Sequence, residues 1–103
     1  MATFVVVDSR RVTRFHLNDF VAVRIKQNNK TFNSASDVLE KYPLIVNRIT
    51  DYILDLFEEG QFVNTYQLLK SFDLAVKELG IDLNNLNSFN ELLITNADVN
   101  KLV

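Results

Sequence analysis

The sequence predicts a small α+β domain, and three observations support this prediction. Two segments in the middle of the chain, 42–60 and 64–79, repeat apolar residues at the spacing of an amphipathic helix. The first third contains short β-branched runs that are typical of strands. Ser34, Asn64 and Ser88 each stand three residues before an acidic or amide side chain, as in a capping box. We therefore expect a small N-terminal antiparallel sheet of about three strands, packed on an antiparallel helical hairpin with short C-terminal helices.

The predicted strands lie within residues 1–33. A short apolar run, 3–7, is followed by a turn at Asp8-Ser9 and by a second extended segment, 10–17. Residues 20–26 alternate apolar and other side chains with a period of two, and this is the most regular strand pattern in the chain. The asparagines of 27–30 then favour a hairpin turn before a returning strand.

The predicted helices begin with a short one after Ser34, which ends near Tyr42. A central helix then begins at Pro43, where proline is tolerated, and ends at Gly60. Its apolar side contains the residues that follow one another at steps of one, three or four, namely Ile45, Ile49, Tyr52, Ile53 and Leu56.

The second long helix extends from Asn64 to Leu79. Its capping box is flanked by a hydrophobic staple of Val63 and Leu68, and Gly80 ends it with Ile81 folding back on Val76. Asp73 can pair with Lys77 one turn later.

The remainder of the chain shows weaker patterns. Residues 82–87 indicate a short helix or tight turns, the capping box at Ser88 predicts a helix to about Thr95, and 96–103 contain enough apolar residues to dock on the body.

Composition removes several classes of function. The chain has no cysteine, one histidine and two glycines, which argues against disulfides, thiol chemistry, a histidine metal pair and a glycine-rich phosphate loop. His16 is a possible base, but a lone histidine on a strand is more often structural. We predict no enzyme activity, no catalytic residue, no metal site and no cofactor.

The length of 103 residues predicts one domain, with a basic β region at 1–33 and an acidic helical region at 34–103. No apolar run approaches the roughly 18 residues that cross a bilayer, so we expect a soluble protein of the cytoplasm. The twelve asparagines are typical of an AT-rich coding sequence, as in viruses and mobile elements. A viral accessory protein in the host cytoplasm is therefore one interpretation, although no motif resembles a known family.

Charge is divided unevenly along the chain. Residues 1–33 contain six basic and two acidic side chains, whereas residues 34–103 contain five basic and eleven acidic ones. An anionic partner would be met by Arg10, Arg11, Arg14, Arg24 and Lys26. A basic partner would be met by Asp51, Asp55, Glu58 and Glu59 on the solvent side of the central helix.

Two functions are consistent with this division. The first is protein–protein interaction or assembly, with another protein or with a second copy as a homo-oligomer, in which complementary charges orient the partners. The run Phe4, Val5, Val6 and Val7 would add an open strand edge for pairing. The alternative is nucleic-acid binding through the basic N-terminal region, which the acidic remainder of the chain would oppose.

Overall fold

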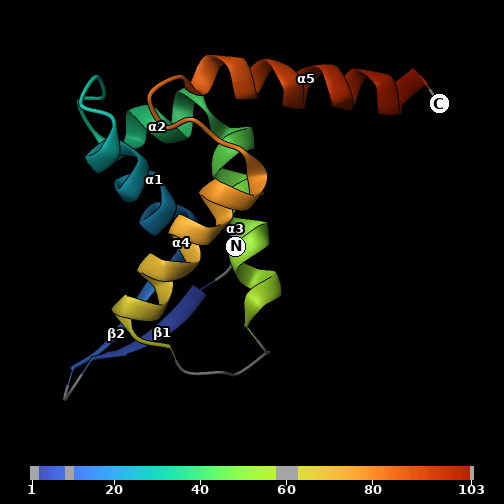
Figure 1. Ribbon diagram of the computed structural model, residues 1–103. Helices are drawn as coiled ribbons and strands as arrows, with labels where there is room; N and C mark the ends of the chain where they lie inside the picture. Colours follow the sequence, from blue (N-terminus) through green and yellow to red (C-terminus); the bar gives the residue numbers. More distant parts are fainter. Residues whose placement is uncertain (1–2, 9–10, 58–62, 103) are drawn as a thin grey trace.

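The computed structural model describes residues 3–8, 11–57 and 63–102, with side chains for residues 16–57 and 63–95. Two strands precede five helices in chain order (Figure 1). The strands are β1, Thr3–Asp8, and β2, Arg11–His16. The helices are α1, Leu17–Asn28; α2, Ala35–Lys41; α3, Pro43–Leu56; α4, Thr65–Leu79; and α5, Leu86–Leu102.

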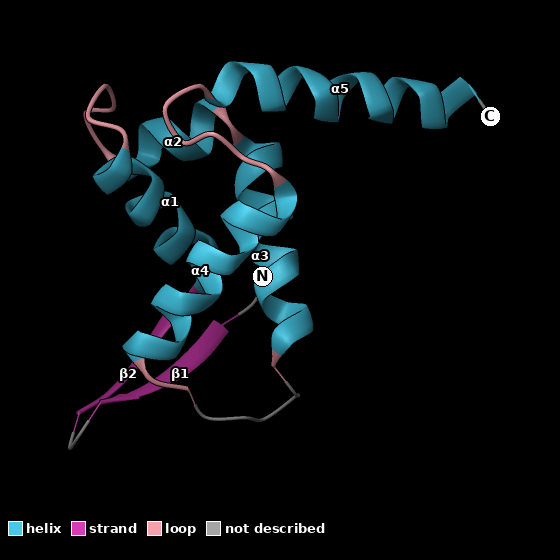
Figure 2. Ribbon diagram, in the orientation of Figure 1, coloured by secondary structure: helices cyan, strands magenta, loops and turns pink. Residues whose placement is uncertain are grey.

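The predicted α+β class is wrong. Helices form most of the described chain, and its sheet contains two strands instead of about three (Figure 2). β1 and β2 pair antiparallel, with Phe4 opposite Phe15 and Val7 opposite Val12. These strands correspond to the first two extended segments of the sequence, but they form a small hairpin at one end of a helical domain. Residues 1–33 are therefore not a β region.

The third predicted strand, 20–26, belongs to helix α1. Leu17, Val21 and Ile25 follow one another at four-residue steps, and all three are fully buried. Val23 shares the period of two with Val21 and Ile25, yet 41% of its surface is exposed. A seven-residue apolar pattern fits both periods, and burial against the other helices selects the helical one. Residues 27–28 consequently belong to α1, and the turn at 30–31 leads to α2 instead of to the predicted returning strand.

Helix α2 begins at the predicted cap. The Asp37 N–H donates to Ser34 Oγ at 3.3 Å. The return bond differs from the prediction, because Asp37 Oδ2 accepts from the Asn33 N–H at 3.2 Å and not from Ser34.

Helix α3 follows directly and begins with Pro43. It buries Ile45, Ile49 and Ile53, as the sequence predicts. It ends at Leu56, because Phe57 has extended backbone angles (φ −117°, ψ 139°). This end lies four residues before the predicted one at Gly60, which is outside the described residues. Leu56, predicted on the buried side, is exposed.

Both ends of α4 have the predicted local chemistry. Asn64 and Gln67 form a complete capping box, with the Gln67 N–H donating to Asn64 Oδ1 at 2.8 Å and the Asn64 N–H donating to Gln67 Oε1 at 2.9 Å. Gly80 is left-handed (φ 69°), and the Ile81 N–H donates to the Val76 carbonyl at 3.0 Å. The predicted pair between Asp73 and Lys77 does not form among the described side chains.

The core lies where α1 packs on the antiparallel pair α3 and α4, with α2 closing one end (Figure 1). Thus a helix, and not a sheet, covers the helical hairpin. Burial of one such aliphatic side chain contributes about 1.5–3 kcal/mol. The fully or almost fully buried apolar residues are Leu17, Val21, Ala22, Ile25, Val38, Ile45, Val46, Ile49, Ile53, Val63, Leu68, Phe72, Ala75, Ile81 and Leu86.

Helix α5 replaces the short helices predicted near the C-terminus. It begins at Leu86, so Ser88 lies inside the helix and does not cap it. Its first turns pack on α3, and the rest extends away from the body (Figure 1). The radius of gyration is 14.4 Å, compared with about 13 Å for a compact domain of this length. None of the helices in the described part of the chain combines the length and apolar character needed to cross a bilayer.

Candidate interaction surfaces

The five basic residues predicted to meet an anionic partner do not lie on one element. Arg11 and Arg14 lie on β2, whereas Arg24 and Lys26 lie on α1. Arg10 lies outside the described residues. The basic β region expected from the sequence is therefore divided between a strand and a helix, because the segment 20–26 is helical.

Arg24 contacts its own domain. Its guanidinium carbon lies 5.7 Å from the centre of the Phe72 ring, which is within the range of a cation–π interaction. Its Nη1 donates to Gln27 Oε1 at 2.9 Å, and its buried Nε has no hydrogen-bond partner among the described residues. Much of this side chain therefore links α1 to α4. A role for it in partner binding stays a prediction.

Two of the four acidic residues predicted to meet a basic partner lie on the described part of α3. Asp51 and Asp55 are exposed on α3, one turn apart, and neither forms an ion pair with a described side chain. Arg48 is exposed three residues before Asp51, so this surface is mixed in charge. Glu58 and Glu59 lie outside the described residues. Binding of a basic partner here stays a prediction.

The predicted strand-pairing edge belongs to β1. Its residues Phe4, Val5, Val6 and Val7 pair with Phe15, Arg14, Thr13 and Val12 of β2. This ladder accounts for one edge of β1, and addition of a partner strand at the other edge stays a prediction.

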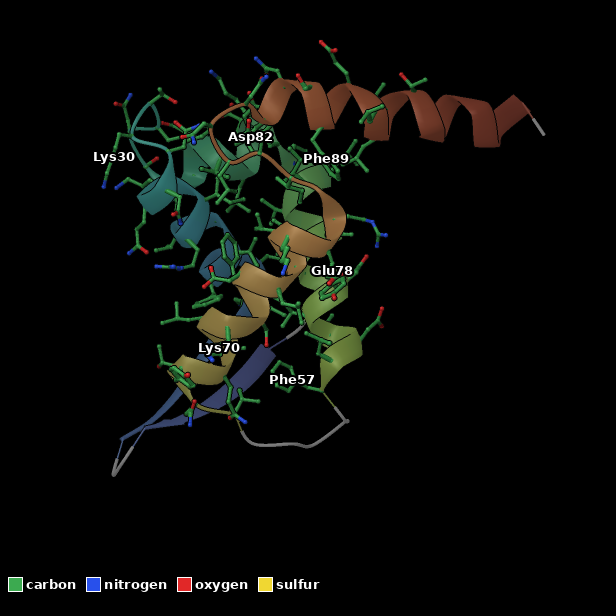
Figure 3. The ribbon with its side chains drawn as sticks, in the orientation of Figure 1. Lys30, Phe57, Lys70, Glu78, Asp82 and Phe89 are labelled. Carbon is green, nitrogen blue, oxygen red and sulfur yellow. The ribbon has the colours of Figure 1, made fainter. Side chains whose placement is uncertain are left out.

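A larger apolar surface, on α5, was missed by sequence reasoning. Leu86 is buried, and Phe89 and Leu93 pack against the core from the same side of the helix. Leu92 and Ile94 are 59% and 47% exposed. Phe89, one turn before Leu92, is labelled in Figure 3. A helix with apolar residues on more than one side contacts neighbours on more than one side. Treating 86–102 as one helix would have revealed this surface from the sequence.

Helix α4 contributes a smaller exposed apolar group. Tyr66 is 63% exposed, and Leu74 is also exposed two turns further on. Lys70 lies between them, with its ammonium 5.0 Å from the centre of the Tyr66 ring (Figure 3 labels Lys70). The hydrogen-bonding interaction with Tyr66 raises the pKa of Lys70 above its ordinary value.

Two adjoining hollows lie beside α2, and the smaller one also reaches the start of α5. The smaller has a volume of about 210 Å³, and the larger, of about 430 Å³, includes Asp37 and Glu40 in its wall. Both are bounded by Thr31, Phe32 and Lys41. Four asparagines complete the wall of the smaller hollow, namely Asn29, Asn84, Asn85 and Asn87.

Within the described residues, no three histidine, aspartate or glutamate side chains lie close enough to hold a metal ion. His16 is exposed where β2 meets α1, as the residue before the first turn of the helix. Comparison of the chain with protein-family models, curated proteins and solved structures gives no match.

Proposed function

We propose that this chain is a non-enzymatic protein-binding module that associates with a second copy of itself, and that α5 supplies the contact. The observation that carries this proposal is that α5 packs on α3 through its first turns and then extends from the body with Leu92 and Ile94 exposed (Figures 1 and 2). We further propose that the protein acts in the cytoplasm.

Helix physics supports a partner for α5. At 17 residues the helix is roughly 25 Å long. An isolated helix shorter than about 12–15 residues is marginal in water, because its stability in proteins comes mostly from packing. The half of α5 beyond Leu93 is shorter than this limit. Burial of its apolar positions against another helix would supply the missing packing.

The spacing of apolar residues along α5 favours a contact with an identical helix. Positions 92 and 99 hold leucine and valine and are separated by one heptad, so they follow the same side of the helix. A two-fold contact would set this side of one copy against the same side of the other. The apolar area of that contact would supply the affinity.

The test is the molar mass of the full chain in solution, measured by light scattering on a size-exclusion column over a range of loading concentrations. We expect the wild type to form a dimer with increasing concentration. Leu92→Glu places a charge in the proposed contact and should give a monomer whose body stays folded, with the same cooperative urea unfolding as the dilute wild type.

Val23→Glu is the matched control, because it adds the same charge at an exposed apolar position of another helix. It should dimerise like the wild type. A wild type that stays monomeric at every concentration would refute the proposal, and equal loss of the dimer in both variants would show that α5 is not the contact.

A further inference from the structure

The smaller hollow lies where three segments of the chain meet. Asn29, Thr31 and Phe32 come from the end of α1 and the loop after it, Lys41 and Tyr42 come from the junction of α2 and α3, and residues 84–87 lead into α5. The figures show α5 beginning above α2 (Figures 1 and 2). The proposed contact between α5 helices does not use this hollow.

Hydrogen bonds fix the position of the walls. Asn29 Nδ2 donates to the Leu83 carbonyl at 2.9 Å, so the end of α1 is tied to the segment before α5. Asn29 Oδ1 accepts from both the N–H and the hydroxyl of Thr31, at 3.1 and 2.7 Å. The Tyr42 hydroxyl donates to Asn87 Oδ1 on the opposite wall. A site held in this way is preorganised, which lowers the cost of ordering it around a ligand.

Several polar groups of the side-chain carboxamides in the wall take no part in these hydrogen bonds. The carboxamides of Asn84 and Asn85 are exposed and have no hydrogen bond to another described residue. The Asn87 oxygen accepts from Tyr42, and its amide nitrogen has no assigned acceptor among the described residues. Each carboxamide offers two N–H donors and one acceptor oxygen. The hollow therefore presents neutral donors and acceptors side by side.

This chemistry discriminates between classes of ligand. Lys41 is the one charged residue in the wall of the smaller hollow, and an arginine fork, the preferred partner of carboxylates and phosphates, is absent from that wall. A hydroxyl group both donates and accepts, so vicinal hydroxyls match a carboxamide. Phe32, half-buried and edge-on to Tyr42 at 5.9 Å between ring centres, adds apolar surface for the C–H groups of a ring.

We propose that the asparagine-lined hollow binds a neutral sugar ring, with Asn84, Asn85 and Asn87 hydrogen-bonding its hydroxyls beside Phe32. The volume of about 210 Å³ is below the roughly 300 Å³ at which sites for drug-sized ligands begin, which suits one ring. The adjoining hollow of about 430 Å³ provides room for a second sugar residue. A disaccharide should therefore bind more tightly than one of its sugar units alone.

The test uses the side-chain amide signals of the ¹⁵N-labelled full chain in NMR spectra. Neutral probes are glucose, galactose, mannose and N-acetylglucosamine, each added alone and as a disaccharide up to high millimolar concentration. We expect at least one of them to shift the signals of Asn84, Asn85 and Asn87 along a saturating curve. Asn84→Ala should weaken that binding about fivefold, the value of one hydrogen bond of about 1 kcal/mol. Asn47→Ala, which removes an exposed carboxamide on α3, should leave the affinity unchanged.

Three results would overturn the inference. The first is the absence of a saturating shift at these asparagines with every sugar. The second is equal affinity of the wild type and Asn84→Ala. The third is tighter binding at the same signals by inorganic phosphate or by acetate, which would show that Lys41 and not the carboxamides selects the ligand. The mass measurements on α5 would be unaffected by any of them.

Discussion

A single glycine decides how α4 ends. Gly80 has φ 69°, and this left-handed conformation allows the Ile81 N–H to reach the Val76 carbonyl. A Cβ built at this position would meet no atom within 4 Å. The requirement for glycine is therefore a property of the backbone and not of the space around it.

Replacement of Gly80 isolates this backbone effect. Gly80→Ala should lower the free energy of unfolding by about 1–2 kcal/mol, since a Cβ strains the left-handed conformation. Gly80→Asn should lose less, because asparagine tolerates that conformation. Urea denaturation of both variants measures the difference. Equal losses for alanine and asparagine would show that the strain is not the cause.

Neighbouring residues of α3 provide a matched pair for the core. Ile53 is fully buried, whereas Leu54 is exposed. Ile53→Ala should cost about 2–5 kcal/mol of stability, through lost burial and the cavity left behind. Leu54→Ala should stay within about 0.5 kcal/mol of the wild type, as surface changes usually do. A similar loss in both variants, measured by thermal or urea unfolding, would contradict the observed burial.

Residue-scale features were predictable where their partners lie close in the sequence. The capping box of Asn64 and Gln67 and the closure by Gly80 depend on residues within one turn, and the structure has both. The role of Arg24 was not predictable, because its ring partner, Phe72, lies 48 positions away. The asparagine-lined hollow was missed for the same reason, since packing brings its three segments together.

At the scale of elements, α1 shows why a short apolar pattern can mislead. Val21 and Ile25 satisfy a period of two and a period of four equally, so the seven residues 20–26 do not choose between strand and helix. Leu17 continues the four-residue spacing of Val21 and Ile25, and all three are buried. Val23, which only the period of two would bury, is exposed, so the burial pattern is that of a helix. The sequence interpretation also divided 82–103, because the pattern at Ser88 resembles a cap although the helix begins at Leu86.

Val23→Glu tests the identity of α1 directly. In the helix this side chain faces solvent, so the variant should differ from the wild type by no more than about 0.5 kcal/mol. In a strand that buried Val21, Val23 and Ile25 together, the same carboxylate would enter the core and cost several kcal/mol. Urea unfolding distinguishes the two results.

The whole molecule consists of a helical body and of α5, which extends beyond it. The body has its own core around α1, α3 and α4. The exposed charges of the described residues are spread over α1 to α5, where screening weakens long-range attraction. This arrangement places the strongest proposed contact on apolar residues of α5 and not on the charge division of the sequence.

The stability of the proposed dimer should depend little on salt, because its contact is apolar. If Leu92 and its apolar neighbours provide the affinity, the dimer should persist as salt is raised from about 0.01 to 1 M, because salt screens charge pairs and not apolar burial. Light scattering at the two ionic strengths measures the dimer fraction. Dissociation at high salt would instead indicate assembly through complementary charge.

We propose that α5 is stable along its whole length only beside a second copy, and amide hydrogen exchange over a range of protein concentrations measures this dependence. We predict that residues 94–102 exchange rapidly in dilute protein and become protected as concentration rises, while the amides of α3 stay protected throughout. Protection of 94–102 that does not change with concentration would contradict the claim.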